Sequence, residues 1–144
     1  MKALQLIAAG ICATAVMSGY SYSSSWYKKE NYREPELLAE LVDQILPGLP
    51  ERNQLAGGWA AHFVAGSSWS LVLNKSWRHM GLRPSLPIVL SSGLASGLAG
   101  VLIWNTAFKL CEKQPHTSKR DFFQHLLAAH LVYSYFVALF SRPQ

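Results

Sequence analysis

Four long apolar segments constrain this chain more than any other feature of its sequence. They lie at residues 3–22, 55–73, 86–108 and 122–140, and none of them contains Asp, Glu, Lys or Arg. A helix needs about 20 apolar residues to cross a hydrocarbon layer of ~30 Å. A soluble helix of this length would carry charged residues on its outer face. The pattern therefore predicts an all-α protein, an integral membrane four-helix bundle in which residues 1–144 form a single domain.

The composition agrees with lipid as part of the solvent. Half of the residues are hydrophobic and 15% are charged, whereas about a quarter of an ordinary soluble domain is charged. The net charge of +5 is not gathered into Lys/Arg clusters interleaved with aromatic residues, so no nucleic-acid partner is expected. Cys12 and Cys111 lie far apart and outside any metal-ligating spacing, and we expect two free thiols, no metal and no cofactor.

The first apolar segment has a second interpretation. Lys2 precedes it, and the small and polar residues of "SGYSYSSS" follow it, which is also the arrangement of a cleaved secretory signal. The small-residue pattern described below recurs in all four segments, and it favours a retained helix.

The polar stretch between the first two segments contains a further helix, predicted at 35–46. Pro35 suits a first helical position and Pro47-Gly48 ends the pattern. Apolar residues recur at helical spacing on one face, namely Leu37, Leu38, Leu41, Val42, Ile45 and Leu46. The other face carries Glu36, Glu40 and Asp43. This amphipathic helix is too short to span, so we expect it to cap the bundle, or to be a surface helix with no further role.

Charge gives conflicting signals about orientation. With four spans both termini lie on one side, together with the basic loop "NKSWRHMGLRPS". That side carries no acidic residue, but the opposite side has more Lys and Arg in total, and the positive-inside rule counts those residues. Because Lys2 precedes the first span and the loop is short and purely basic, we expect cytoplasmic termini.

Small or weakly polar residues recur every fourth position in each segment and form one stripe per helix. The residues expected at helix contacts are Gly10, Gly58, Gly66, Gly93, Gly97, Gly100 and Ser134. Helices associate in lipid through such close-approach stripes. The pattern thus predicts a compact bundle.

Two histidines lie on these stripes, His62 and His130. Counted from the segment starts, both fall ~10–12 Å below the same membrane surface. Ionisable side chains in membranes usually face the interior or a watery cavity. We therefore expect a polar pocket that opens toward the long-loop side, with candidate residues His62, His130, His125, Thr14, Ser18 and Asn105.

Three functions are open for that pocket. The histidines can be structural, hydrogen-bonded across helices in a structural or partner-binding membrane component. They can relay protons in a small transporter, although no predicted span contains a carboxylate. They can also ligate haem from facing helices. We expect no enzyme, because the chain has no HExxH, GxSxG or phosphate-binding loop. Expected partners are the bilayer and another membrane protein or a second copy of the chain.

Four stretches resemble a family of small bacterial four-span inner-membrane proteins of uncharacterised activity. They are "AAGICATAVMSGYSY", "AGGWAAHFVAG", "SSGLASGLAG" and "HLLAAHLVYSYF". The shared pattern is a G-x-x-A-T-x-x-M-S first helix with histidines in the second and fourth spans. The resemblance implies four spans and an inner-membrane location, and it implies no activity.

Overall fold

The structure, a computed structural model, describes residues 3–111 and 116–141, and within these residues the regular secondary structure is all helical, with short turns and loops between the helices. The prediction of an all-α fold is thus confirmed. The five helices are α1 (Ala3–Lys28), α2 (Glu34–Ile45), α3 (Glu51–His79), α4 (Leu86–Leu110) and α5 (Lys119–Phe140). Three of the long helices, α1, α3 and α4, extend past the apolar segments at their C-terminal ends, and α3 and α5 begin before theirs, because polar and charged residues continue them.

Three of these helices, α1, α4 and α5, are long and apolar enough to cross a membrane. The membrane prediction is confirmed to that extent. The helix α3 has 29 residues but is not among the three. Its length suffices, and its stripe of glycine, histidine and serine lowers its hydropathy. Composition therefore supports three crossing helices rather than the four we expected.

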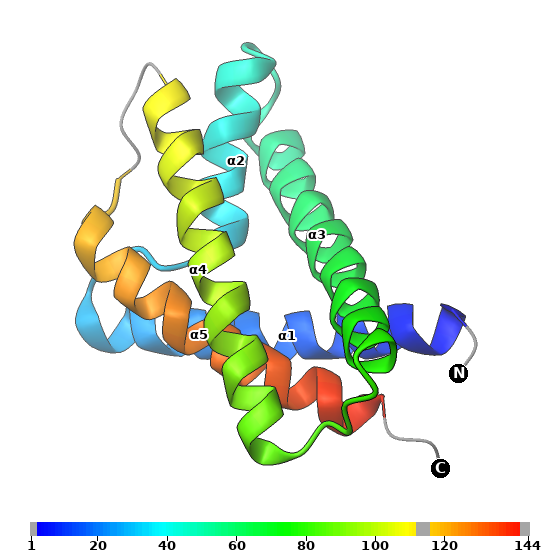
Figure 1. Ribbon diagram of the computed structural model, residues 1–144. Helices are drawn as coiled ribbons and strands as arrows, with labels where there is room; N and C mark the ends of the chain where they lie inside the picture. Colours follow the sequence, from blue (N-terminus) through cyan, green and yellow to red (C-terminus); the bar gives the residue numbers. More distant parts are fainter. Residues whose placement is uncertain (1–2, 112–115, 142–144) are drawn as a thin grey trace.

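The helices form two layers (Figure 1). In one layer α1 and α5 lie side by side and run in opposite directions. In the other, α3 packs on α1 and α4 packs on α5, while α2 lies along α3 near its N-terminal end. Within the described residues α3 and α4 meet only next to the loop that joins them, where the Trp77 indole N–H donates to the Ser92 hydroxyl at 2.8 Å, and elsewhere each packs closely against other helices. The arrangement is therefore more open than the compact bundle that the small-residue stripes predicted.

Glycines allow backbones to approach at the helix contacts. A β carbon on Gly93 would lie 3.0 Å from the Leu131 Cα of α5, and one on Gly97 would lie 3.1 Å from the Leu127 Cα. At the contact between α1 and α3, a β carbon on Gly10 would lie 2.8 Å from the Ser67 Cα. Real β carbons are essentially never found under 3.0 Å from a backbone atom, so Gly10 requires glycine for the observed spacing, while at Gly93 and Gly97 an added β carbon would force α5 to shift slightly.

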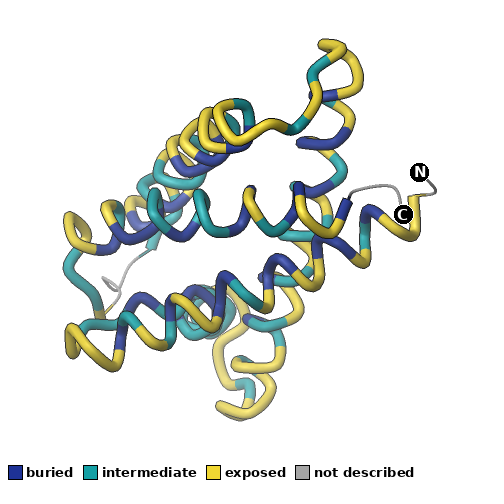
Figure 2. The backbone as a smooth tube through the Cα atoms, turned by 90° about the horizontal axis from the view of Figure 1, so that it is seen from below, coloured by how far each residue is buried: buried dark blue, intermediate teal, exposed yellow. Residues whose placement is uncertain are grey.

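Exposed positions alternate with buried ones along the long helices (Figure 2), and many of the exposed ones are large apolar residues, although the core also contains large side chains such as Phe108 and Phe122. The clearest case is a ridge on α4, where every fourth residue is an exposed leucine: Leu86, Leu90, Leu94, Leu98 and Leu102. Their exposed fractions run from 43% to 67%. A surface of this kind is stable against hydrocarbon chains and costly in water.

The helix α2 docks on α3 through backbone contact at Gly58. A β carbon at this position would overlap the Pro35 carbonyl oxygen and lie 2.7 Å from the Ala39 amide nitrogen. The docked face buries Leu37 completely. Because α2 starts at Glu34, one residue before the predicted start, the docking also carries an acidic residue inward.

Replacing Gly58 with Ala should therefore undock α2. Overpacking of this kind costs about 1–3 kcal/mol, and we expect the variant to unfold at lower temperature and to lose protection of α2 from protease. Gly57→Ala is the matched control, since its β carbon would meet only the Val42 methyl groups at 3.5 Å. There the higher helix propensity of alanine should leave stability unchanged or raise it by up to about 1 kcal/mol. Equal behaviour of the two variants would contradict this account of the docking.

Candidate functional site

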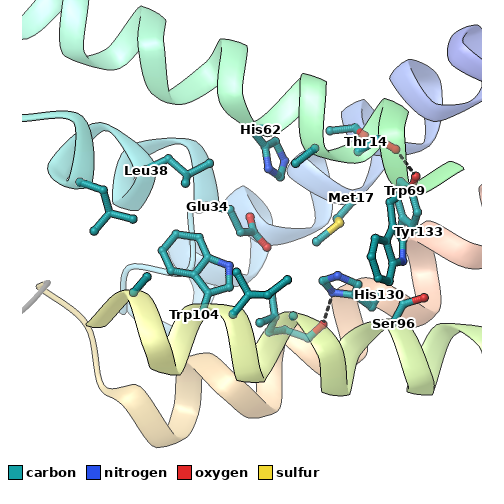
Figure 3. Close-up of a pocket in the computed structure, with 17 residues that line it drawn as sticks. Thr14, Met17, Glu34, Leu38, His62, Trp69, Ser96, Trp104, His130 and Tyr133 are labelled. Atoms are coloured by element: carbon teal, nitrogen blue, oxygen red, sulfur yellow. Dashed lines mark hydrogen bonds between the residues drawn. The ribbon is translucent and has the colours of Figure 1, made fainter. Parts of the chain in front are cut away.

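A cavity of about 220 Å³ lies between the two layers, beneath α2. All five helices contribute to its wall, which is mostly apolar (Figure 3). The polar and aromatic side chains that line it include Glu34, His62, Trp69, Trp104, His130 and Tyr133. The volume corresponds to about seven water molecules at ~30 Å³ each. The cavity exists because α3 and α4 diverge while α1 and α5 close its floor.

Glu34 is the acidic residue of this cavity. Its side chain points inward from the first turn of α2 (Figure 3), and the residue is 2% exposed. The Ser21 hydroxyl donates a hydrogen bond of 2.8 Å to Oε1. The second carboxyl oxygen, Oε2, is buried and has no hydrogen-bond partner among the described residues. Burial raises the pKa of Glu34 to about 7, and the bond from Ser21 only partly opposes this.

A hydrogen-bonded chain joins this carboxyl to α1 and α5. The Ser21 hydroxyl lies 2.9 Å from the Nε2 atom of His125. Since the single proton of Ser21 is donated to an ionised Glu34, His125 must donate its Nε2–H to the serine oxygen. When Glu34 is protonated, the chain can run in the opposite direction. The His125 ring is held by stacking on Tyr20 and Tyr32, with ring centroids 5.0 and 4.6 Å away.

A second chain places His62. Its Nε2 atom lies 3.0 Å from the Ser18 hydroxyl, which donates to the Thr14 carbonyl at 2.9 Å. Because the bond to the Thr14 carbonyl uses the serine proton, His62 must donate its Nε2–H to the Ser18 oxygen. The Thr14 hydroxyl in turn donates to the Gly10 carbonyl at 2.7 Å. His62 is thus tied to α1 by one nitrogen while its ring lines the cavity.

His130 lines the same cavity from α5. Its Nδ1–H donates to the Leu126 carbonyl at 2.9 Å, which leaves Nε2 as an acceptor. The ring packs against Gly100, where a β carbon would lie 3.0 Å from Cε1. Each cavity histidine therefore uses one nitrogen within the protein. The described residues include no group of three or more His, Cys, Asp or Glu arranged to hold a metal.

The other candidates divide between the cavity and the helix contacts. Thr14 lines the cavity, and Gly66 lies directly against the Thr14 side chain. The Ser134 hydroxyl lies opposite Gly93 and donates to the His130 carbonyl. Asn105 is only partly buried and does not line the cavity. The structure therefore brings most of the candidates together and leaves Asn105 outside.

Residues of the site that were missed from the sequence include Glu34, Ser21 and Trp69, and also Trp104 and Tyr133. Glu34 was missed because it precedes Pro35, where we placed the helix start. An acidic residue just before a proline-started helix usually lies at the solvated N-terminus. Ser21 was considered only as part of "SGYSYSSS", the small and polar stretch at the end of the first segment. Trp69 was missed because a single large residue beside a small-residue stripe does not indicate which surface it contacts.

Comparisons with known proteins give no assignment. No family model matches the chain, and neither a curated protein nor a solved structure matches it.

The buried carboxyl should make stability depend on pH. Below pH 4.5 Glu34 is protonated in both states, but between pH 4.5 and 7 the unfolded chain releases this proton while the folded protein retains it. Stability should therefore fall as the pH rises through this interval, by about 3 kcal/mol at 1.36 kcal/mol per pKa unit. Unfolding in detergent at several pH values measures it. Glu34→Gln should remove this dependence of stability on pH, whereas Glu36→Gln, outside the cavity, should retain it. If the stability of Glu34→Gln varies with pH as that of the wild type does, the assignment to Glu34 is refuted.

Proposed function

We propose that this protein is a small bacterial inner-membrane protein in which α1, α3, α4 and α5 cross the membrane, and that it binds a small, largely apolar molecule in the cavity beneath α2. In this proposal the leucine ridge of α4 faces lipid or a second membrane protein. The termini are cytoplasmic. The helix α2 covers the mouth of the cavity on the opposite side.

Contacts at the helix ends support a fourth crossing by α3. The Ser70 hydroxyl donates to the Leu6 carbonyl at 2.9 Å, and the Asn74 amide donates to the Ser141 hydroxyl at 3.1 Å. The end of α3 therefore lies beside the start of α1 and the end of α5. A helix that shares these levels with two apolar helices is expected to share their hydrocarbon layer, with its glycine and serine stripe turned toward α1.

The ligand-binding role rests on one observation: a largely apolar cavity contains two buried polar groups without partners. They are Glu34 Oε2 and the indole Nε1 of Trp69, each unpaired within the described residues. An unsatisfied buried polar atom costs about 1–3 kcal/mol. Such atoms in one pocket are typical of a site that is completed by a bound molecule.

A second candidate is proton-coupled transport through the same cavity. Our sequence analysis counted against transport because no predicted span contains a carboxylate. Glu34, brought in by α2, supplies one in hydrogen-bonded contact with Ser21. Uptake of the bound molecule into proteoliposomes under a pH gradient, abolished by Glu34→Gln, is the expected result. Binding without uptake would eliminate transport and leave the binding role.

The number of crossings can be tested by labelling. Cys12 and Cys111 are first replaced by serine. Three variants then carry one cysteine each, at position 29, 83 or 111, and intact cells are treated with a membrane-impermeant maleimide. Four crossings place positions 29 and 111 on one side and position 83 on the other. If α3 does not cross, positions 29 and 83 are labelled together and 111 is not, which would overturn the four-span proposal.

Filling the cavity should abolish binding. Ala107 lines it and Ala95 on the same helix does not, so Ala107→Phe and Ala95→Phe form a matched pair. Toluene binding is measured by saturation transfer with the protein in nanodiscs and with empty nanodiscs as the reference. Toluene should bind the wild-type protein and Ala95→Phe. We expect at least a tenfold loss of affinity in Ala107→Phe. No specific toluene signal from the wild-type protein would mean that the cavity holds only water.

A further inference from the structure

The chemistry of the cavity narrows the class of molecule that it can hold, given the proposed binding function. The unpartnered Glu34 Oε2 atom is a strong hydrogen-bond acceptor whenever the carboxyl is ionised. Among the described residues no Lys or Arg lines the cavity. The nearest guanidinium along the chain, on Arg33, is engaged with Glu36 at 2.8 Å. The carboxylate of Glu34 therefore lacks a counter-charge from the described part of the protein.

Aromatic rings surround the same space. Trp69, Trp104 and Tyr133 all line the cavity, from three different helices (Figure 3). The negative faces of aromatic rings attract organic cations, by about 0.5–2 kcal/mol each. Aliphatic side chains make up most of the remaining wall, including Met17, Leu38 and Ile103. An anionic group within aromatic and aliphatic walls fits a cation with an apolar body.

A metal cation fits this cavity poorly. Hard cations such as Ca²⁺ take about six to eight oxygen ligands. Besides the carboxyl group, the side-chain oxygens on the wall belong to Thr14, Ser96 and Tyr133. Each of these three hydroxyls donates its proton to a backbone carbonyl, which fixes its direction. One carboxyl group with three such hydroxyls cannot replace the hydration shell of a metal ion.

We propose that the cavity binds a small protonated amine with an apolar body, whose ammonium group pairs with the carboxylate of Glu34 and whose body contacts the aromatic side chains. The ammonium N–H donates to Oε2, which removes the unsatisfied atom. The pair is neutral, so the site can bury it at far lower cost than the lone carboxylate. The divergence of α3 and α4 leaves the body of the ligand room between the layers.

Binding then exchanges one proton for one organic cation. Below neutral pH the carboxyl of Glu34 holds a proton, which must leave before the ammonium group can pair with it. The groups that face or neighbour this carboxyl are Ser21 and Tyr22 on α1, His62 on α3, and His125 and His130 on α5, while α4 presents Trp104 and no charged side chain. None of these groups carries a fixed charge, and the charged neighbours on the chain, Arg33 and Glu36, pair with each other. Glu34 is the one carboxyl among the described residues that line the cavity, so we assign the dependence on pH to it.

Benzylamine and its neutral counterpart benzyl alcohol test the proposal, with the full-length protein in nanodiscs and empty nanodiscs as reference. The pKa of Glu34 near 7 predicts that benzylamine binds about thirtyfold more weakly at pH 5.5 than at pH 8, because only the ionised fraction is competent. Benzyl alcohol should show no such dependence. Glu34→Gln should weaken benzylamine at pH 8 by at least tenfold and leave benzyl alcohol unchanged, while Glu36→Gln should leave both unchanged.

Each other outcome decides a different point. If toluene and benzyl alcohol bind but benzylamine does not, the amine proposal fails and the binding function stands. If none of the three binds, both fail. Benzylamine affinity that is the same at pH 5.5 and 8 in the wild-type protein would overturn the role of Glu34, even if the Glu34→Gln variant does not fold.

Discussion

The backbone contact between α2 and α3 at Gly58 is the constraint on which the whole candidate site depends. A side chain as small as alanine at this position would overlap the Pro35 carbonyl. Because the two backbones touch, the start of α2 lies within the helix layers instead of in the interface. Glu34 and Leu37 are buried as a result, and the space between the diverging α3 and α4 gains a cover.

This contact creates an electrostatic conflict. A carboxyl group with no facing cation is placed among aliphatic and aromatic side chains, where desolvation favours its neutral form. The Ser21 and His125 groups relieve the conflict only at Oε1. A chain selected for stability alone would place an apolar residue here, as buried charges rarely contribute net stability. Buried carboxyls with perturbed pKa values are concentrated at functional sites. In our proposal the cost of burying Glu34 serves ligand binding in the cavity beside it.

Periodicity in the sequence was informative for the helices and for which residues share a helix face. The stripes found from sequence include Gly93 and Gly97, which lie against α5, and His62 and His130, which line one cavity. These inferences need only the helical repeat and the rise per residue. Partners across helices were not predictable in the same way. Ser18 was a candidate, but its bond to His62 depends on how α1 and α3 are rotated.

The sequence by itself determined an all-α protein with apolar helices that lack charged residues, because in lipid each helix must satisfy its own backbone hydrogen bonds. It also determined that the helices approach closely, since small residues recur every fourth position. Only the tertiary structure decided that α3 and α4 diverge and that α2 turns Glu34 inward. The reason is physical: the direction of a short amphipathic helix is set by the surface it docks on, and that surface, with Gly58 at its centre, forms only when the long helices have packed.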